Sequence, residues 1–222
     1  ASRGLGDVYK RQVLITLGII GIMASLTLPA VIGHYKKVET ASRLKKFYSS
    51  IQQAIVMSEA VNGEVSSWIK PASSSDYDMQ GKVSKEFFLK YLAPYFKYVE
   101  IIDGRSIIQE DGTKSGTETR IFLADGSSFS LNNGGCMDVI FDSNGNKLPN
   151  TFAKDQFTFY FCFAENEKLN RCGSSKKTFC TAKNGVLTRD EALNKCKQIP
   201  YYCTGLLEYD NWEFKDDYPY KL

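Results

Sequence analysis

Six cysteines carry the chemistry that is easiest to anticipate in this chain. All of them lie beyond residue 135, at Cys136, Cys162, Cys172, Cys180, Cys196 and Cys203. No two have C-x-x-C spacing, which argues against a zinc ribbon and against a thioredoxin-type redox pair. An even, clustered set instead predicts disulfides and an oxidising compartment. Many connectivities are possible, and the pairs with short loops, Cys172–Cys180 and Cys196–Cys203, are the ones we favour.

A second set of polar residues has the chemistry of a calcium site. Asp142, Asn144 and Asn146 alternate around a glycine, and Asp155 could close the set with a further oxygen ligand. The segment lacks the spacing and the distal glutamate of an EF-hand loop. We therefore interpret it as an Asn/Gly turn between strands and predict no metal or other cofactor, with calcium as the alternative.

Catalysis and nucleic-acid binding find little support in the composition. The only histidine is His34, so mechanisms and metal sites that need two imidazoles are excluded. The chain has no P-loop, no G-x-G-x-x-G motif and no G-x-S-x-G elbow. With 28 basic and 25 acidic residues the net charge is +3, too balanced for a strong nucleic-acid footprint. We predict neither an enzyme nor a specific nucleic-acid partner.

The most prominent predicted element is an uncharged stretch from Val13 to Ile32, VLITLGIIGIMASLTLPAVI. As a helix it would span roughly 30 Å, the thickness of a bilayer's hydrocarbon core. Small residues would allow close packing of other helices, and the proline should loosen the helix near its end. A cleaved signal and a buried core helix are the alternatives. The residues expected to carry membrane insertion and assembly are Val13, Leu14, Ile15, Leu17, Gly18, Gly21, Ala24, Ser25 and Pro29.

Residues 33–62 predict an amphipathic continuation of the same helix. Spacings of three, four and seven place one set of side chains on one face, and Asn62-Gly63 is a plausible stop. That face consists of Leu44, Phe47, Ile51, Ala54, Ile55 and Ser58. We expect one long helix from Val13 to about Ala60, whose second half packs against a globular domain.

Residues 63–222 predict that domain, a head of α+β class. We expect a surface loop over 64–82 and a helix from Ser84, as its N-cap, to about Phe96. Short β-like runs follow, and they predict an antiparallel sheet against which the long helix packs. These runs are Thr119–Leu123 and Ser128–Leu131, which flank a turn at 124–127, then Met137–Phe141 and Phe157–Phe161.

The stretch VLITLGIIGIMASLTLPAVIGHYKKVETASRLKKFYSSIQQAI resembles the N-terminal segment of type IV prepilins and type II secretion pseudopilins, including the position of Pro29. Phe141–Phe161 and Tyr201–Leu222 resemble segments of pilin-like heads. The resemblance implies a structural subunit held in the bacterial inner membrane by a single pass, with its head in the periplasm. It also implies processing by prepilin peptidase and assembly with other pilin-like subunits into a filament.

Residues 1–12 depart from that family. Gln12 stands where the family has its glutamate, and Val8 where the methylated first residue of the mature chain would be. The string DVYKRQ at 7–12 resembles the translation of a sequencing adapter. We therefore interpret residues 1–12 as non-native, the alternative being a genuine polar N-terminus.

Two other functions stay open at the level of the sequence. A minor tip subunit or membrane-anchored module could bind a ligand, a surface or DNA through exposed aromatics at Tyr201, Tyr202, Tyr209 and Trp212. A secreted domain would instead lose the apolar stretch and start near Gly33. The lysines after the stretch favour a cytoplasmic head by the positive-inside rule, whereas the cysteines favour a translocated one, and we give the cysteines more weight.

Overall fold

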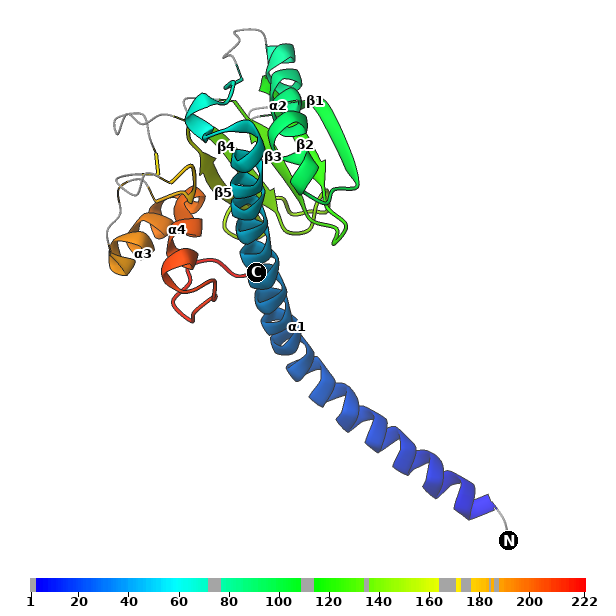
Figure 1. Cartoon of the computed structure of the whole chain (residues 1–222). Helices are drawn as coiled ribbons and strands as arrows, with labels where there is room; N and C mark the ends of the chain where they lie inside the picture. Colours follow the sequence, from blue (N-terminus) through cyan, green and yellow to red (C-terminus); the bar gives the residue numbers. More distant parts are fainter. Residues whose placement is uncertain are drawn as a thin grey trace.

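The computed structural model describes residues 3–71, 77–108, 114–133, 136–163, 171–172, 177–183, 185 and 188–222. Its first element is one continuous helix, α1 (Arg3–Asn62), which crosses the head and projects far beyond it (Figure 1). The helix remains helical through Pro29. It ends where predicted, because Gly63 adopts a φ of +77° and its N–H bonds to the carbonyl of Glu59 at 3.0 Å.

The head is built on one antiparallel sheet of six strands that follow one another in chain order. The predicted hairpin is confirmed, with Ile121 opposite Phe129 and a positive φ at Gly126 in the turn. The first strand is interrupted by a bulge between Ile102 and Arg105. The strands are β1 (Glu100–Ile108), β2 (Lys114–Phe122), β3 (Ser128–Asn132), β4 (Met137–Asp142), β5 (Gln156–Phe161) and β6 (Phe179–Thr181).

The second half of α1 forms the centre of the head's core. All six side chains of the predicted face are buried, and Phe47 is only 2% exposed. Its ring stacks on Phe141 at 4.5 Å between centroids, with Phe129 at 5.1 Å and Phe159 at 5.4 Å. The α+β class and the packing of the long helix on the sheet are therefore confirmed.

The predicted boundary of the second helix is wrong. The helix α2 (Tyr77–Tyr91) begins inside the segment expected to be a loop, and Ser84 is not its cap but a buried residue within it that donates to the carbonyl of Gln80. Gly81 explains the early start, since a Cβ there would lie 2.9 Å from the backbone nitrogen of Gly104. The absence of a side chain lets the first turns of α2 lie directly on β1 and β2.

The rest of the predicted loop is also more ordered than expected where the structure describes it. A short 3-10 helix, η1 (Val65–Ser67), leads into Trp68, which is 5% exposed. The indole stacks on Tyr91 with 4.5 Å between ring centroids and donates to the carbonyl of Gly63 at 2.7 Å. After α2 comes a second 3-10 turn, η2 (Ala93–Tyr95), which contains the proline expected near the helix end.

The C-terminal part of the head contains three elements that the sequence analysis did not predict. They are α3 (Arg189–Gln198), η4 (Pro200–Tyr202) and α4 (Cys203–Tyr209). Disulfides Cys172–Cys180 and Cys196–Cys203 form as predicted, and Cys136–Cys162 completes the set. The aromatics expected to be exposed here are not: Trp212 is 8% exposed, with its ring 5.1 Å from that of Tyr48, and Tyr201, Tyr202 and Tyr209 are partly buried.

Candidate assembly helix and the pocket at its base

The N-terminal half of α1 presents apolar side chains on all sides. This helix is long enough and apolar enough to cross a membrane, and its most apolar 18-residue window has a mean hydropathy of 2.2. No part of that window is buried, which argues against a core helix. Leu14, Ile20 and Leu26 are 69%, 61% and 75% exposed. None of the residues that the structure describes covers this segment.

The hydroxyl side chains between Val13 and Ile32 all donate to carbonyls of the helix itself. Thr16 donates to the carbonyl of Val13 at 2.9 Å, and Ser25 donates to that of Ile22 at 2.8 Å. Such bonds leave no hydroxyl in need of water, so the segment suits an apolar environment. The nine residues expected to carry insertion and assembly all lie on this projecting half.

Two glycines of this half are not required by any contact among the described residues. A Cβ built at Gly18 or at Gly21 would meet nothing within 4 Å. Glycine also costs about 1 kcal/mol relative to alanine inside a helix. What they offer is a narrow surface on which another helix could approach closely.

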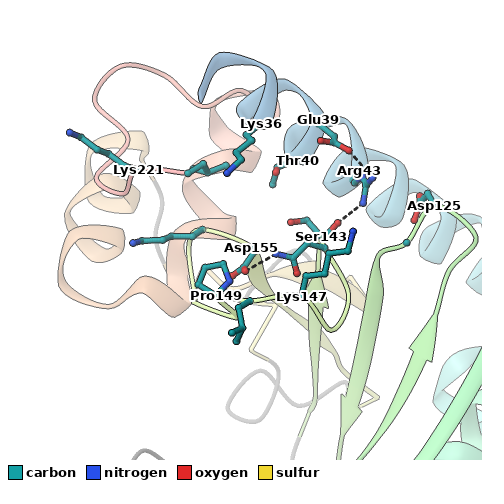
Figure 2. A pocket seen from close by; sticks show the side chains of 15 residues that line it. Lys36, Glu39, Thr40, Arg43, Asp125, Ser143, Lys147, Pro149, Asp155 and Lys221 are labelled. Carbon is teal, nitrogen blue, oxygen red and sulfur yellow. Dashed lines mark hydrogen bonds and ion pairs between the residues drawn. The ribbon is translucent and has the colours of Figure 1, made fainter. Parts of the chain in front are cut away.

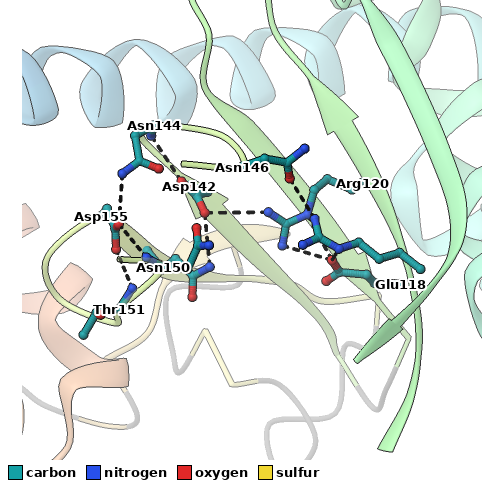
Figure 3. A network of polar contacts seen from close by, with 10 residues as sticks. Glu118, Arg120, Asp142, Asn144, Asn146, Asn150, Thr151 and Asp155 are labelled. Atoms are coloured by element: carbon teal, nitrogen blue, oxygen red, sulfur yellow. Dashed lines mark hydrogen bonds and ion pairs between the residues drawn. The ribbon is translucent and has the colours of Figure 1, made fainter. Parts of the chain in front are cut away.

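The four candidate calcium ligands take part in hydrogen bonds within the head. Asp155 accepts hydrogen bonds from the backbone N–H groups of Asn150 (2.8 Å) and Thr151 (2.5 Å) and from the side chain of Asn144 (3.0 Å). Figure 3 shows these bonds holding the connection between β4 and β5 together. Asn146 accepts from Arg105 on β1 instead. The carboxylate therefore acts as an internal brace of the turn.

Asp142, the other carboxylate of the set, is buried at the end of β4. Its oxygens accept from the backbone N–H of Asn144 and from the side chain of Gln156, each at 3.1 Å, and Arg120 lies 3.6 Å away. Burial raises the pKa of Asp142 to about 6, against the opposing effect of these donors. In the part of the chain that is described, no three His, Cys, Asp or Glu side chains are grouped so as to hold a metal ion.

A pocket of about 460 Å³ lies beside α1 where the helix enters the head. Figure 2 shows α1 on one side of it and the β4–β5 connection on the other. Arg43 ties the two sides together, since it donates to the carbonyl of Ser143 at 2.6 Å and to Glu39 at 2.7 Å. Its basic lining residues are Lys36, Arg43, Lys147, Lys154 and Lys221, and Glu39, Asp125 and Asp155 are the acidic ones.

Sequence patterns did not indicate this pocket. Its residues come from four separate stretches of the chain, 36–43, 125–126, 143–155 and 221–222, so no local motif marks it. The lysines that follow the apolar stretch were visible in the sequence, but a run of lysines on its own indicates only a solvated face. In the structure, lysines that are far apart in the sequence line the same pocket.

Comparison with known proteins gives a family and no function. A family model described as "Family of unknown function (DUF6613)" matches residues 30–222. That match covers the head and the second half of α1 and leaves out most of the apolar segment. No curated protein and no solved structure matches the chain.

Proposed function

The chain belongs to the DUF6613 family, and we propose that this member is a pilin-like or pseudopilin structural subunit of a type IV pilus or type II secretion filament. The observation that carries the proposal is α1 itself. One helix supplies both an exposed apolar half and the central core element of a disulfide-bonded head. A subunit that moves from a membrane into a filament needs this combination, because its apolar half must change partners while its head stays folded.

In the proposed mechanism the helix first holds the subunit in the bacterial inner membrane, with the head in the periplasm. Three disulfides support a translocated head, because disulfides persist in oxidising compartments. Prepilin peptidase would process the native precursor, whose leader would precede Val13. The apolar half then leaves the lipid and packs against the same half of other subunits.

Packing in that filament would depend on shape more than on charge. Lipid chains are as apolar as leucine, so helices associate through close contact of small residues. Gly18 and Gly21, with Ala24 and Ser25 beyond them, provide such a surface on the uncovered half of α1. The aromatics that a binding module would need at the C-terminal end are buried or partly buried, which favours the structural role.

The proposal is tested by recovering the genomic sequence upstream of Val13 and expressing the complete gene with a type IV pilus assembly system. We expect a basic leader and a glutamate-containing box ahead of Val13, and the subunit in sheared filaments. A mature protein that starts near Gly33 and is released from the membrane would refute the proposal.

Variants of the same gene separate insertion from assembly. A Cβ at Gly21 would meet none of the described residues within 4 Å, so Gly21→Leu should leave the head and the membrane fraction unchanged and lower filament yield at least about tenfold. Gly21→Asp should also lower the membrane fraction, since a carboxylate at the bilayer centre costs about 3 kcal/mol. The matched control is Ile22→Leu, which keeps an apolar side chain of similar volume. Normal filaments from both Gly21 variants would contradict helix packing at this position.

A further inference from the structure

We propose that the pocket beside residues 36–43 of α1 binds the phosphate-bearing headgroup of an anionic phospholipid, at the surface of the membrane that anchors the chain. This inference rests on the proposed membrane anchoring and adds a ligand to it. Its basis is the charge of the pocket, its height above the apolar segment, and the rigidity of its walls.

The charge of the pocket is concentrated in four lysines without a fixed partner. Lys36, Lys147, Lys154 and Lys221 line it, and none forms an ion pair with any residue in the described ranges. Ammonium groups are compact point charges that bind phosphate well. A singly charged phosphodiester is the anion whose oxygens several such groups can share.

The acidic side chains around the pocket are already occupied. Glu39 pairs with Arg43 at 2.7 Å, and Asp125 pairs with Lys46 at 3.0 Å. The Asp155 carboxylate is taken up by N–H donors of its own loop. Each of these three carboxylates therefore already has a direct donor, and none of them forms an ion pair with the four lysines.

The end of the pocket nearest the apolar segment, at Lys36, lies at the height of a headgroup layer. Lys36 lies four residues after Ile32, which is about 6 Å along a helix with a rise of 1.5 Å per residue, and Arg43 lies about 16 Å along it. Polar headgroups occupy roughly 5–8 Å on each side of the hydrocarbon core. Lys36 would thus sit among headgroups if Val13–Ile32 spans the core. The chain's C-terminal end, which carries Lys221, lies beside α1 at this level (Figure 1).

The walls of the pocket are held in place before any ligand arrives. Arg43 joins α1 to the β4–β5 connection through the carbonyl of Ser143, and both Thr40 and Ser143 are buried at that junction. Figure 2 shows Lys36 and Lys147 approaching the hollow from these two walls. A site with fixed walls loses little conformational freedom on binding, which favours retention of one headgroup over loose attraction to the surface.

The test uses the full chain in nanodiscs with equal amounts of phosphatidylglycerol and phosphatidylcholine. Lipids that stay on the protein after release are counted by native mass spectrometry. The pocket variant Lys147→Gln/Lys154→Gln/Lys221→Gln is compared with Lys82→Gln/Lys90→Gln/Lys97→Gln, which removes the same charge on and just after α2. We expect the wild type and the control to retain phosphatidylglycerol preferentially, and the pocket variant to lose at least about fivefold of that preference.

Three results would overturn the headgroup site. They are an unchanged preference in the pocket variant, an equal loss in the control variant, and displacement of the retained lipid by soluble glycerol 3-phosphate at millimolar concentration. The last would assign the pocket to a free phosphoester. A chain that does not insert into nanodiscs overturns the anchoring itself, whereas an inserted chain without lipid preference overturns the headgroup site alone.

Discussion

Replacement of Phe47 by alanine should destabilise the whole head, although the residue belongs to the helix that also carries the apolar segment. Phe47 is 2% exposed, and its ring centroid lies within 6.5 Å of those of Phe96, Phe129, Phe141, Phe159 and Phe179. Truncation of a buried phenylalanine to alanine costs about 3–5 kcal/mol through lost burial and the cavity left behind. With so many ring contacts we expect about 4 kcal/mol. That is a large share of the roughly 5–15 kcal/mol that keeps a domain folded.

The measurement is urea unfolding of the full chain in detergent micelles, followed by tryptophan fluorescence. Both tryptophans of the chain, Trp68 and Trp212, are buried in the head and report on it alone. With a slope of about 2 kcal/mol per molar urea, Phe47→Ala should lower the midpoint by about 2 M. The control on the same helix is Val56→Ala, 66% exposed, which should change stability by less than about 0.5 kcal/mol. Equal midpoints for the two variants would mean that α1 rests on the head and is not part of its core.

Removal of the Cys136–Cys162 disulfide by a double serine variant should lower the free energy of unfolding by about 3.5 kcal/mol, because this disulfide closes a loop with a separation of 26 residues. Removal of either shorter loop, with a separation of 8 or 7 residues, should cost about 2.5 kcal/mol. Equal urea midpoints for the three variants would contradict this. The pKa of Asp142, raised to about 6 by burial, means that the folded head holds this proton more readily than the unfolded chain. The stability of the wild type relative to Asp142→Asn should therefore fall as pH rises from about 4 to about 6, by at most about 3 kcal/mol, and a difference independent of pH would refute it. Thr188→Ala breaks the capping box with Glu191 and should cost about 1 kcal/mol in thermal or urea unfolding, more than the exposed Lys197→Ala.

The elements that the sequence predicted correctly are those with a regular pattern of side chains. The second half of α1 repeats apolar residues at helical spacing. The strands β3, β4 and β5 are short β-like runs that are mostly buried, and they lie within a few positions of their predicted ends. The start of α2 was misplaced because Ser84 follows polar residues and has the form of a cap. The close approach of Gly81 to the sheet, which a side chain would prevent, depends on the tertiary fold and gives no local signal in the sequence.

Other features depended on contacts between distant segments. In β1, the Asp-Gly pair at 103–104 looks like a turn, yet the structure places it within the strand as a bulge. The two short disulfides follow from loop length, whereas Cys136–Cys162 follows from the register that sets Met137 opposite Phe161. The lysine pocket could not be predicted from the sequence, because the folded chain brings its lysines together from distant stretches. By contrast, α3 had a visible signal, because Thr188 and Glu191 have the spacing of a capping box.

An open sheet has two edge strands whose outer N–H and C=O groups could pair with another chain. In this sheet neither edge strand offers a long, regular row of such groups. At one edge, β6 has only three residues. At the other, β1 is nine residues long, but its register breaks between Ile102 and Arg105, where Gly104 adopts a φ of +69°. A bulge of this kind twists a strand away from the straight ladder that another chain would need for pairing. If heads lie side by side as in the proposed filament, these edges would disfavour strand-to-strand aggregation, and contacts between heads would be made by side chains.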